Sequence, residues 1–323
     1  MKILLTGGTG FIGQHMAKML VDHGYDVNCI IRNSKLRDKL PENVTVFVKD
    51  LKDVREIPDC MAGVDVVIHI AAQLGHHGVP AETYYKVNYL ATQTLLEMAV
   101  EHNVLQFIFC SAPFVVGLGG RLTTEDAPYA PKGDYSDTKV LAEKYIIEKG
   151  EKRIRYTILR TSYVYGPGDI RRISLYKSIL RKRFILTTNG KAHLQPTYVT
   201  DIVNGFLLSI KNESAYGQII NLAGDECTVQ EYLECIADAV GSKLIKINIG
   251  YSISVFLACI MEFLSKLIFK KPGLVTKSRI DFLALDHSCS VEKASKLLGY
   301  KPVVSLKDGI KRTIEWAKEK NYL

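Results

Sequence analysis

The sequence predicts an α/β fold with a doubly wound parallel sheet and a smaller C-terminal domain. Apolar runs of strand length alternate with helical patterns through the first half of the chain, and the alternation loosens after Gly166-Pro167-Gly168. Parallel strands need a crossover, usually a helix, so this alternation indicates a parallel sheet covered by helices on both faces. We place one domain at 1–165, rejoined by 198–222, and a second, substrate-binding domain at 166–323.

The opening residues predict a phosphate-binding turn. An apolar strand at 2–5 is followed by the glycine-rich stretch 7–13 and by helical spacing over 14–22. Glycines let the backbone take positive φ and approach a ligand closely, and the free N–H groups of a helix start attract anions. We therefore predict a dinucleotide site with contacts from Gly7, Gly10, Phe11, Ile12 and Gly13.

The other elements follow in the order that a doubly wound sheet requires. Short apolar runs predict strands, and longer patterned segments between them predict the crossover helices. The expected strands are 27–31, 44–48, 64–70, 107–110, 155–159 and 219–221, and the expected helices are 83–101, 136–149 and 199–211.

Composition narrows the class of protein. The formal charge of +8 is mild for 323 residues and is spread along the chain, which argues against nucleic acid and favours anionic small molecules. The seven cysteines are scattered without a Cys-x-x-Cys pair or a metal-ligand cluster, so we expect no metal and a reducing compartment. The glycine turn starts at residue 7 and leaves no space for a signal peptide, so we expect a cytoplasmic protein.

Tyr135 and Lys139 are the predicted catalytic residues. They stand four residues apart at the start of a helical segment, so both side chains project from one face. The phenol has an ordinary pKa near 10, but a nearby ammonium and a nicotinamide cation favour the phenolate and lower that pKa. Tyr135 can then exchange a proton with a hydroxyl or carbonyl group.

Several short motifs occur in a fixed order along nearly the whole chain. They are Thr6-Gly7-Gly8-Thr9-Gly10-Phe11-Ile12-Gly13, Asp50-Leu51, His69-Ile70-Ala71-Ala72, Asn88, Tyr135-x-x-x-Lys139, Val164-Tyr165-Gly166-Pro167-Gly168-Asp169 and Asn221-Leu222-Ala223-Gly224. In this order they resemble the extended short-chain dehydrogenase/reductase family, within the NAD-dependent epimerase/dehydratase superfamily.

The resemblance implies a Rossmann-type fold and a set of cofactor contacts. Asp50 would bond the adenine amine, and Lys139 would bridge the ribose hydroxyls and Tyr135. A homodimer through helices 83–101 and 136–149 is also implied. Thr161 stands where relatives usually carry proline. The other contacts implied by the resemblance are Leu51, Ala71, Ala72, Asn88, Ser111 and Val164.

The end of the second predicted strand bears on cofactor choice. Enzymes specific for NAD usually place a carboxylate there to bind the ribose 2′-hydroxyl, whereas an arginine accommodates a 2′-phosphate. This chain has Arg32 and Lys35 and no acid between them. NADP(H) is therefore favoured, and NAD(H) remains the alternative if Arg32 is only a solvated turn residue.

Position 112 departs from the family pattern. The Ser or Thr that binds the reacting oxygen in relatives falls on Ala112, and Ser111, one residue earlier, should face away from the substrate. Loss of such a donor typically costs about 2.7–4 kcal/mol, roughly 100- to 1000-fold in rate. Three accounts remain open: an engineered substitution, a hydroxyl borrowed from Thr123 or Thr124, and weakened catalysis.

The second half of the chain bears on the substrate. Leu194 replaces the arginine that clasps a sugar diphosphate in epimerases, although His193 or Lys191 could compensate. The downstream motifs 276–279 and 291–300 resemble the 3β-hydroxysteroid dehydrogenase and dihydroflavonol-reductase branch.

The segment 253–269 is apolar on all sides and is followed by Lys270-Lys271. Its longest apolar run is too short for the roughly 20 residues that span a bilayer. It could be a core or dimer helix, a lid over a lipophilic substrate, or a membrane-surface contact.

A basic run and a histidine pair are two further candidates for substrate contact. The basic run 171–183 could hold an acidic substrate, but such runs more often solvate a helix face. His76-His77 follow the fourth predicted strand, so a substrate contact there is a hypothesis.

The sequence as a whole supports one leading hypothesis. We expect an NADP(H)-dependent oxidoreductase that interconverts a secondary alcohol and a ketone on an apolar substrate of steroid, flavonoid or β-keto type. The alternatives are a nucleotide-sugar epimerase or dehydratase with bound NAD, and a dinucleotide-binding sensor with little turnover.

Overall fold

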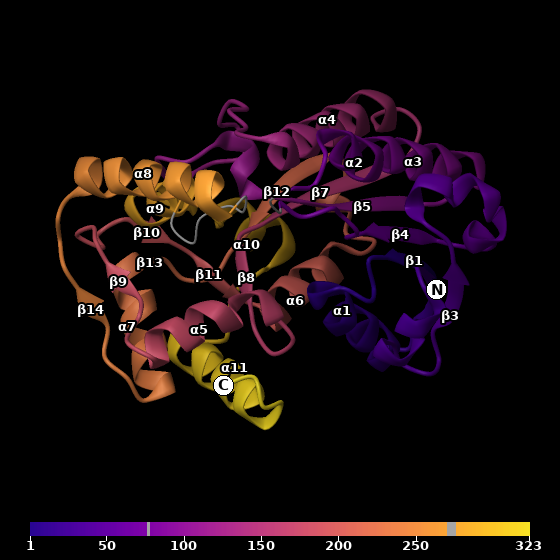
Figure 1. Cartoon of the computed structure of the whole chain (residues 1–323). Coiled ribbons are helices and arrows are strands. Elements are labelled where there is room, and N and C mark those ends of the chain that lie inside the picture. The colour runs from indigo at the N-terminus through magenta and orange to yellow at the C-terminus, as the bar shows by residue number, and fades with distance from the viewer. Residues whose placement is uncertain (76–77, 270–275) are drawn as a thin grey trace.

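A seven-stranded parallel sheet forms the centre of the first half of the molecule (Figure 1). The computed structural model describes residues 1–75, 78–269 and 276–323, so the His76-His77 hypothesis lies outside the described residues. The strand order is β12-β7-β5-β4-β1-β2-β3. The strands are β1 (Lys2–Thr6), β2 (Asp26–Ile31), β3 (Thr45–Val48), β4 (Val66–His69), β5 (Gln106–Ser111), β7 (Arg155–Thr161) and β12 (Gln218–Leu222).

The strand order reverses direction between β1 and β4. Successive strands run from β1 to β3 on one side and from β4 to β12 on the other. In open α/β sheets the carboxyl ends of the strands at such a switch point border the ligand crevice. The predicted Rossmann-type fold is confirmed, and all seven predicted strands are present with ends shifted by at most a few residues.

Helices cover both faces of the sheet (Figure 1). One face carries α1 (Phe11–Asp22), α6 (Val199–Ser209) and α10 (Glu292–Leu298), whose apolar residues share a core with β1 and β2. The other face carries α3 (Ala91–Glu101) and α4 (Asp134–Gly150). The helix predicted at 83–101 begins as α2 (Ala81–Tyr84) and passes through a π-helical segment, η4 (Tyr85–Leu90), before α3.

The second half has its own core around three helices, α5 (Ile173–Leu180), α7 (Val229–Val240) and α11 (Leu306–Glu319). A four-stranded sheet lies beside it in the order β13-β10-β15-β6. Its strands are β6 (Gly120–Thr123), β10 (His193–Leu194), β13 (Cys227–Thr228) and β15 (His287–Cys289). Two strand pairs complete this half, β8 (Tyr163–Tyr165) with β11 (Pro196–Tyr198) and β9 (Ile185–Leu186) with β14 (Ile245–Lys246).

The two halves exchange segments along the chain. Strand β6 leaves the first half to join the second sheet, whereas β12 and α10 return from the second half to the central sheet. The carboxyl ends of β5 and β7 therefore lie where the two halves meet, and the chain crosses between the halves beside them.

Helix α8 (Tyr251–Phe269) lies on the outside of the second half, packed on α9 (Lys277–Ala284) (Figure 1). Phe256 and Phe263 are 65% and 66% exposed, so the interpretation of this segment as a core helix is wrong. Because the segment is apolar on all sides, its sequence pattern cannot show which face packs against the protein. Among the described residues no helix has the length and hydropathy to cross a bilayer.

Candidate active site

The glycine turn after β1 is packed so closely that two of its glycines have no room for a side chain. Gly7 has φ +77°, and a Cβ atom there would lie 2.7 Å from the backbone nitrogen of Ala71. A Cβ atom on Gly13 would lie 2.0 Å from the carbonyl oxygen of Gly7. Both positions therefore require glycine, because a side chain would separate β1, the turn and α1.

Helix α1 starts without a side-chain cap. Gly10 is its N-cap in an extended conformation, and no side chain accepts a hydrogen bond from the first turn. Unpaired N–H groups at a helix start, together with the helix dipole, form an anion-binding site. The residues predicted as a phosphate cradle thus fit the pyrophosphate of a dinucleotide.

A buried hydrogen-bond relay fixes the loop after β4. Thr92 donates to the carbonyl of Asn88 (2.7 Å), so its oxygen accepts from His69 Nε2 (2.9 Å), and His69 Nδ1 then accepts from Thr6 Oγ1 (2.6 Å). Thr6 Oγ1 in turn accepts from the backbone N–H of Ala71 (3.3 Å). Burial, with a smaller contribution from Lys139, lowers the pKa of His69 to about 3, which keeps the ring neutral as this relay requires.

The side chain of Asn88 forms hydrogen bonds with the same loop after β4. Its Oδ1 accepts from the backbone N–H of Gln73 (2.7 Å), and its Nδ2 donates to the carbonyl of Gln73 (3.1 Å) and to Thr138 Oγ1 (3.2 Å). Asn88 lies in the π-helical segment η4, and π-turns often occur at functional sites. The side chain joins the loop after β4 to α4, so it positions that loop rather than pointing freely into the crevice.

Tyr135 and Lys139 lie on the first turns of α4, which starts at Asp134 after Gly133. Lys139 Nζ donates to the carbonyl of Cys110 (2.7 Å) and lies 4.3 Å from the ring centroid of Phe109. Lys139 is 2% exposed, and burial lowers its pKa to about 8, opposed by the neighbouring Cys110 and Glu143.

The pKa of Tyr135 departs from the expectation. Burial raises it, Cys110 adds to the rise, and Arg171 partly offsets it. In the chain alone this pKa is not lowered, because desolvation disfavours the phenolate and the ammonium of Lys139 contacts the Cys110 carbonyl. The phenol is therefore protonated in the chain alone. The lowering expected beside a nicotinamide cation stays a prediction.

Ser111 belongs to a buried ionic network behind the site. Its hydroxyl donates to Glu143 Oε1, and Tyr129 donates to Glu143 Oε2 (2.9 Å). Arg160 and Glu143 form an ion pair (Nη2 to Oε2, 2.7 Å) with side chains 2% and 0% exposed. The Ser111 hydroxyl is therefore occupied inside the protein, and only its backbone is left for the predicted cofactor contact.

Position 112 holds a buried methyl group at the end of β5. Ala112 precedes the short helix η5 (Pro113–Val116) in an extended conformation. Of the two candidate donors, Thr123 uses its hydroxyl on the carbonyl of Ser288 (3.2 Å) between β6 and β15, and Thr124 is exposed. A borrowed hydroxyl would therefore have to come from Thr124 or from another residue.

The other predicted cofactor contacts gather at the carboxyl edge of the sheet. Ala71 and Ala72 follow β4, Thr161 ends β7, and Val164 lies on β8 directly after it. Thr161 donates to the carbonyl of Ser111 (3.4 Å), which ties β7 to β5 where relatives were expected to carry proline. Parallel strands bring these residues together although the sequence separates them.

The adenosine end of the predicted site lies at β2 and β3. Asp50 caps the 3₁₀ helix η2 (Leu51–Glu56) by accepting from the N–H of Lys52 (3.1 Å), and Leu51 is buried. Arg32 follows β2 directly, and Lys35 lies in the 3₁₀ helix η1 (Ser34–Lys39); both side chains are exposed. The predicted 2′-phosphate contacts are thus accessible to a ligand.

A row of aromatic rings borders the end of β5. The ring centroids of Tyr163 and Phe282 lie 5.0 Å apart, those of Phe282 and His287 4.4 Å, and those of His287 and Phe114 6.4 Å. Phe114 and His287 also line a small hollow beside η5. The sequence analysis missed this row because its members come from four separate segments and share no spacing.

His287 adds one polar atom to the row. Its Nδ1 donates to the carbonyl of Leu285 (2.9 Å), so Nε2 is a bare acceptor. Nε2 is buried and has no hydrogen-bond partner among the described residues. Buried polar atoms are normally paired, so the missing partner of Nε2 marks an unused acceptor in this row.

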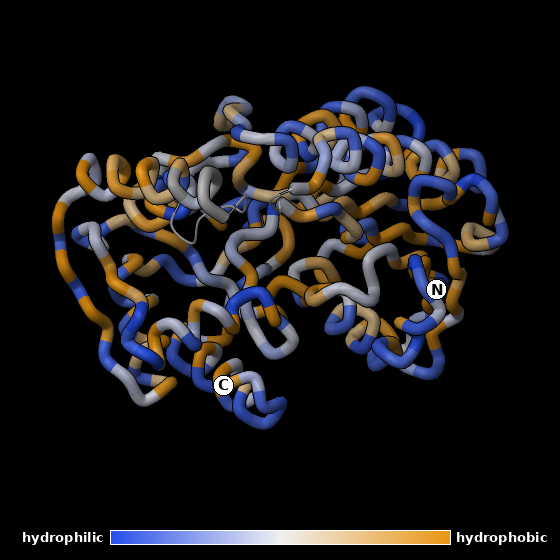
Figure 2. The backbone as a smooth tube through the Cα atoms, viewed as in Figure 1, coloured by the Kyte–Doolittle hydropathy of each residue, from blue (hydrophilic) through white to orange (hydrophobic). Residues whose placement is uncertain are grey.

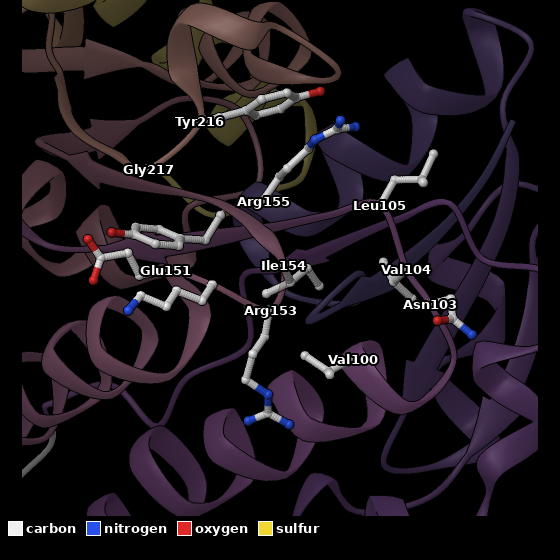
Figure 3. A pocket seen from close by; sticks show the side chains of 12 residues that line it. Val100, Asn103, Val104, Leu105, Glu151, Arg153, Ile154, Arg155, Tyr216 and Gly217 are labelled. Carbon is white, nitrogen blue, oxygen red and sulfur yellow. The ribbon is translucent and has the colours of Figure 1, made fainter.

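A further surface hollow lies at the opposite edge of the central sheet. It is lined by Leu105, Arg155, Tyr216 and neighbouring residues at the amino ends of β5 and β7 (Figure 3). Ligands of open α/β sheets bind at the carboxyl ends. This hollow is therefore remote from the candidate active site.

Comparisons with known proteins agree with this geometry. A family model described as "NAD dependent epimerase/dehydratase family" matches residues 3–223. The mouse sterol-4-alpha-carboxylate 3-dehydrogenase (decarboxylating) is 28% identical, over 97% of this chain and 90% of that protein. The 2-alkyl-3-oxoalkanoate reductase of Stenotrophomonas maltophilia is 26% identical, over 97% of this chain and 98% of that protein. An uncharacterized UDP-glucose epimerase of Bacillus subtilis is 28% identical, over 98% of each.

Solved structures share the fold. The UDP-glucuronic acid 4-epimerase of Bacillus cereus, in complex with UDP-glucuronic acid and NAD, superposes with a TM-score of 0.79. It is 24% identical, over 99% of this chain and 100% of that chain.

Proposed function

Because the chain belongs to the NAD dependent epimerase/dehydratase family, we propose that it is an NADP(H)-dependent oxidoreductase for an apolar ketone or secondary alcohol. It is an NAD(P)-dependent enzyme of the extended short-chain dehydrogenase type, as its family and its sterol dehydrogenase relatives indicate. The preference for NADP(H) and the apolar substrate are the parts that we propose.

The chain's own residues supply the binding and the proton. The turn from Gly7 to Gly13 and the start of α1 would hold the pyrophosphate, and Lys139 would bind the ribose hydroxyls. When bound, the nicotinamide accepts or supplies the hydride. In the reducing direction, Tyr135 donates its phenolic proton to the developing alkoxide, and the ammonium of Lys139 stabilises the phenolate that remains.

The observation that carries the substrate proposal is the aromatic row from Phe114 to Tyr163. It offers ring surfaces and a single acceptor, His287 Nε2, beside the end of β5. Such a wall suits an apolar substrate with one hydrogen-bond donor better than a charged diphosphate. The names of the sterol dehydrogenase and oxoalkanoate reductase relatives point to the same class.

The epimerase alternative has a specific difficulty. Leu194, which stands where epimerases carry an arginine, is fully buried in the core of the second half. His193 uses both its backbone N–H (2.7 Å) and its Nδ1 (3.0 Å) on Asp286. Leu194 offers a diphosphate no hydrogen-bond donor, and Asp286 already holds one ring nitrogen of His193. The exposed Lys191 and the Bacillus subtilis relative keep the epimerase as the alternative.

The test of the proposed function is turnover. Purified protein with NADPH is offered steroid, flavonoid and β-keto substrates, and the absorbance of the reduced nicotinamide is followed. We expect oxidation of NADPH with at least one apolar ketone and none with UDP-sugars. Interconversion of UDP-glucose without net change in the cofactor would establish the epimerase instead, and binding of NADPH without any turnover would favour the sensor.

The substitution Arg32→Asp tests cofactor choice. The exposed guanidinium after β2 can pair a 2′-phosphate with charge-assisted hydrogen bonds of about 1.5–3 kcal/mol, so NADPH affinity should fall roughly 10- to 100-fold. NADH affinity should stay constant or improve. Lys39→Asp, at the far end of η1, is the control of equal charge change. Equal losses for the two cofactors, measured by fluorescence titration, would refute the assignment.

The lowered pKa of Lys139 predicts a pH dependence of cofactor binding. The group is an ammonium below about pH 8 and loses its charge as the pH rises through that value. Because the charged form binds ribose hydroxyls as a donor, NADPH affinity should fall above about pH 8. In Lys139→Met the affinity should be lower and flat across this range. A wild-type affinity that does not change up to pH 9.5 would contradict this role.

The homodimer stays a proposal that rests on the family resemblance. Tyr85, Leu90 and Leu141 are exposed apolar residues on the two helical segments that relatives pair. Covering them would be favourable.

A further inference from the structure

Helix α8 presents its large apolar residues to the solvent. Phe256, Leu257, Ile260 and Met261 recur at helical spacing and form one exposed stripe, which Ile253 and Phe263 extend. Figure 2 shows the hydrophobic colour of α8 at the outer edge of the second half. A stripe of this size on a helix that faces water indicates an interaction surface.

The covered face of α8 carries small residues. Ser254 and Ala258, four positions apart, are buried against the body of the protein. The Ser254 hydroxyl lies within hydrogen-bond distance of Thr187 Oγ1 (3.0 Å) and of the carbonyls of Thr187 and Gly250. Surface helices normally bury the large apolar side chains and expose the polar ones, so α8 has the reverse orientation.

The net charge of the sequence from α8 to α9 distinguishes between possible partners. Residues 251–281 contain five basic residues, namely Lys266, Lys270, Lys271, Lys277 and Arg279, and two acidic ones, Glu262 and Asp281. A two-fold contact between copies would bring two segments of the same positive net charge together. An anionic lipid surface would instead attract such a segment.

We propose that α8 lies in the interface of an anionic phospholipid bilayer, with the stripe from Ile253 to Phe263 inserted among the lipid chains. The helix lies on the surface and does not span the bilayer. Binding through α8 also brings α9, which carries Phe282 of the aromatic row, next to the lipid. An apolar substrate dissolved in the bilayer would then have a short path to the site.

The experiment is flotation with lipid vesicles, without cofactor or substrate. We expect the full-length protein to float with vesicles of phosphatidylcholine and phosphatidylglycerol, much less with phosphatidylcholine alone, and less at high salt. A fluorophore on Cys259, the one exposed cysteine of the seven, should shift to shorter wavelength when anionic vesicles are added.

Matched variants locate the contact. Phe256→Asp/Phe263→Asp should weaken vesicle binding at least about tenfold, because two large apolar side chains are removed from the lipid. The control Val48→Asp/Leu105→Asp changes two exposed apolar residues far from α8 and should bind as the unaltered protein does. Circular dichroism checks that both variants fold.

Two outcomes would overturn the proposal. One is an unaltered protein that does not float with anionic vesicles. The other is a dimer in solution that Phe256→Asp/Phe263→Asp dissociates while vesicle binding is absent, which would assign the stripe to a second copy. The readout is independent of turnover, so a failure here is distinct from a failure of the proposed oxidoreductase activity.

Discussion

Replacement of Tyr135 by phenylalanine is expected to lower kcat by about 100- to 10,000-fold, the usual contribution of a positioned general acid. The side chain lies on the first turn of α4, one turn before Lys139. In the chain alone its pKa is raised, so at neutral pH it carries the proton that ketone reduction requires. Phenylalanine keeps the ring and removes only the hydroxyl group that carries this proton, so NADPH affinity should be retained.

Steady-state kinetics with an apolar ketone, together with fluorescence titration of NADPH, checks this result. Tyr216→Phe is the matched control, because Tyr216 lies in the remote hollow with Arg155 (Figure 3). It should leave both kcat and cofactor affinity unchanged. A Tyr135→Phe variant that retains full turnover would remove the proposed acid and, with it, the proposed mechanism.

The substitution Ala112→Ser is expected to raise kcat by roughly 100- to 1000-fold, the reverse of losing one donor to a developing oxyanion. Ser111 points into the buried network at Glu143, so the next side chain along the extended backbone faces the opposite side. A hydroxyl at position 112 would lie at the carboxyl end of β5, beside the reacting oxygen that Tyr135 protonates.

The same ketone panel measures the effect. Ala62→Ser adds a hydroxyl at an exposed position before β4, at the amino edge of the sheet, and should change nothing. A large rise in Ala112→Ser would indicate an engineered or weakened site. An unchanged rate would refute the prediction and show that another group polarises the carbonyl, in which case Thr124→Val should lower the rate.

Local patterns predicted the parts of the site that depend on neighbouring residues. The glycine turn, the four-residue spacing of Tyr135 and Lys139 and the opposite orientations of the side chains at 111 and 112 follow from backbone geometry over a few residues. The order of strands and helices predicted the sheet for the same reason, since each crossover needs its helix.

Other features could not be read from neighbouring residues. The π-helical segment that places Asn88 has no signal in the apolar pattern, which is continuous from α2 to α3. The buried ion pair of Glu143 with Arg160 joins a helix to a strand, and neither residue is marked as buried in the sequence. The return of α10 to the central sheet depends on contacts with α6 and β12, which lie well before it in the chain.

The sequence by itself determined the Rossmann-type sheet, the phosphate-binding turn and the Tyr135–Lys139 pair, because each depends on local spacing and on the conformational freedom of glycine. Only the tertiary structure decided the pKa of Tyr135 and Lys139, the aromatic row at His287 and the exposed face of α8. Each of these features depends on which side chains from distant parts of the sequence cover the residue and exclude water from it. Burial is a property of the packed chain and not of any segment within it.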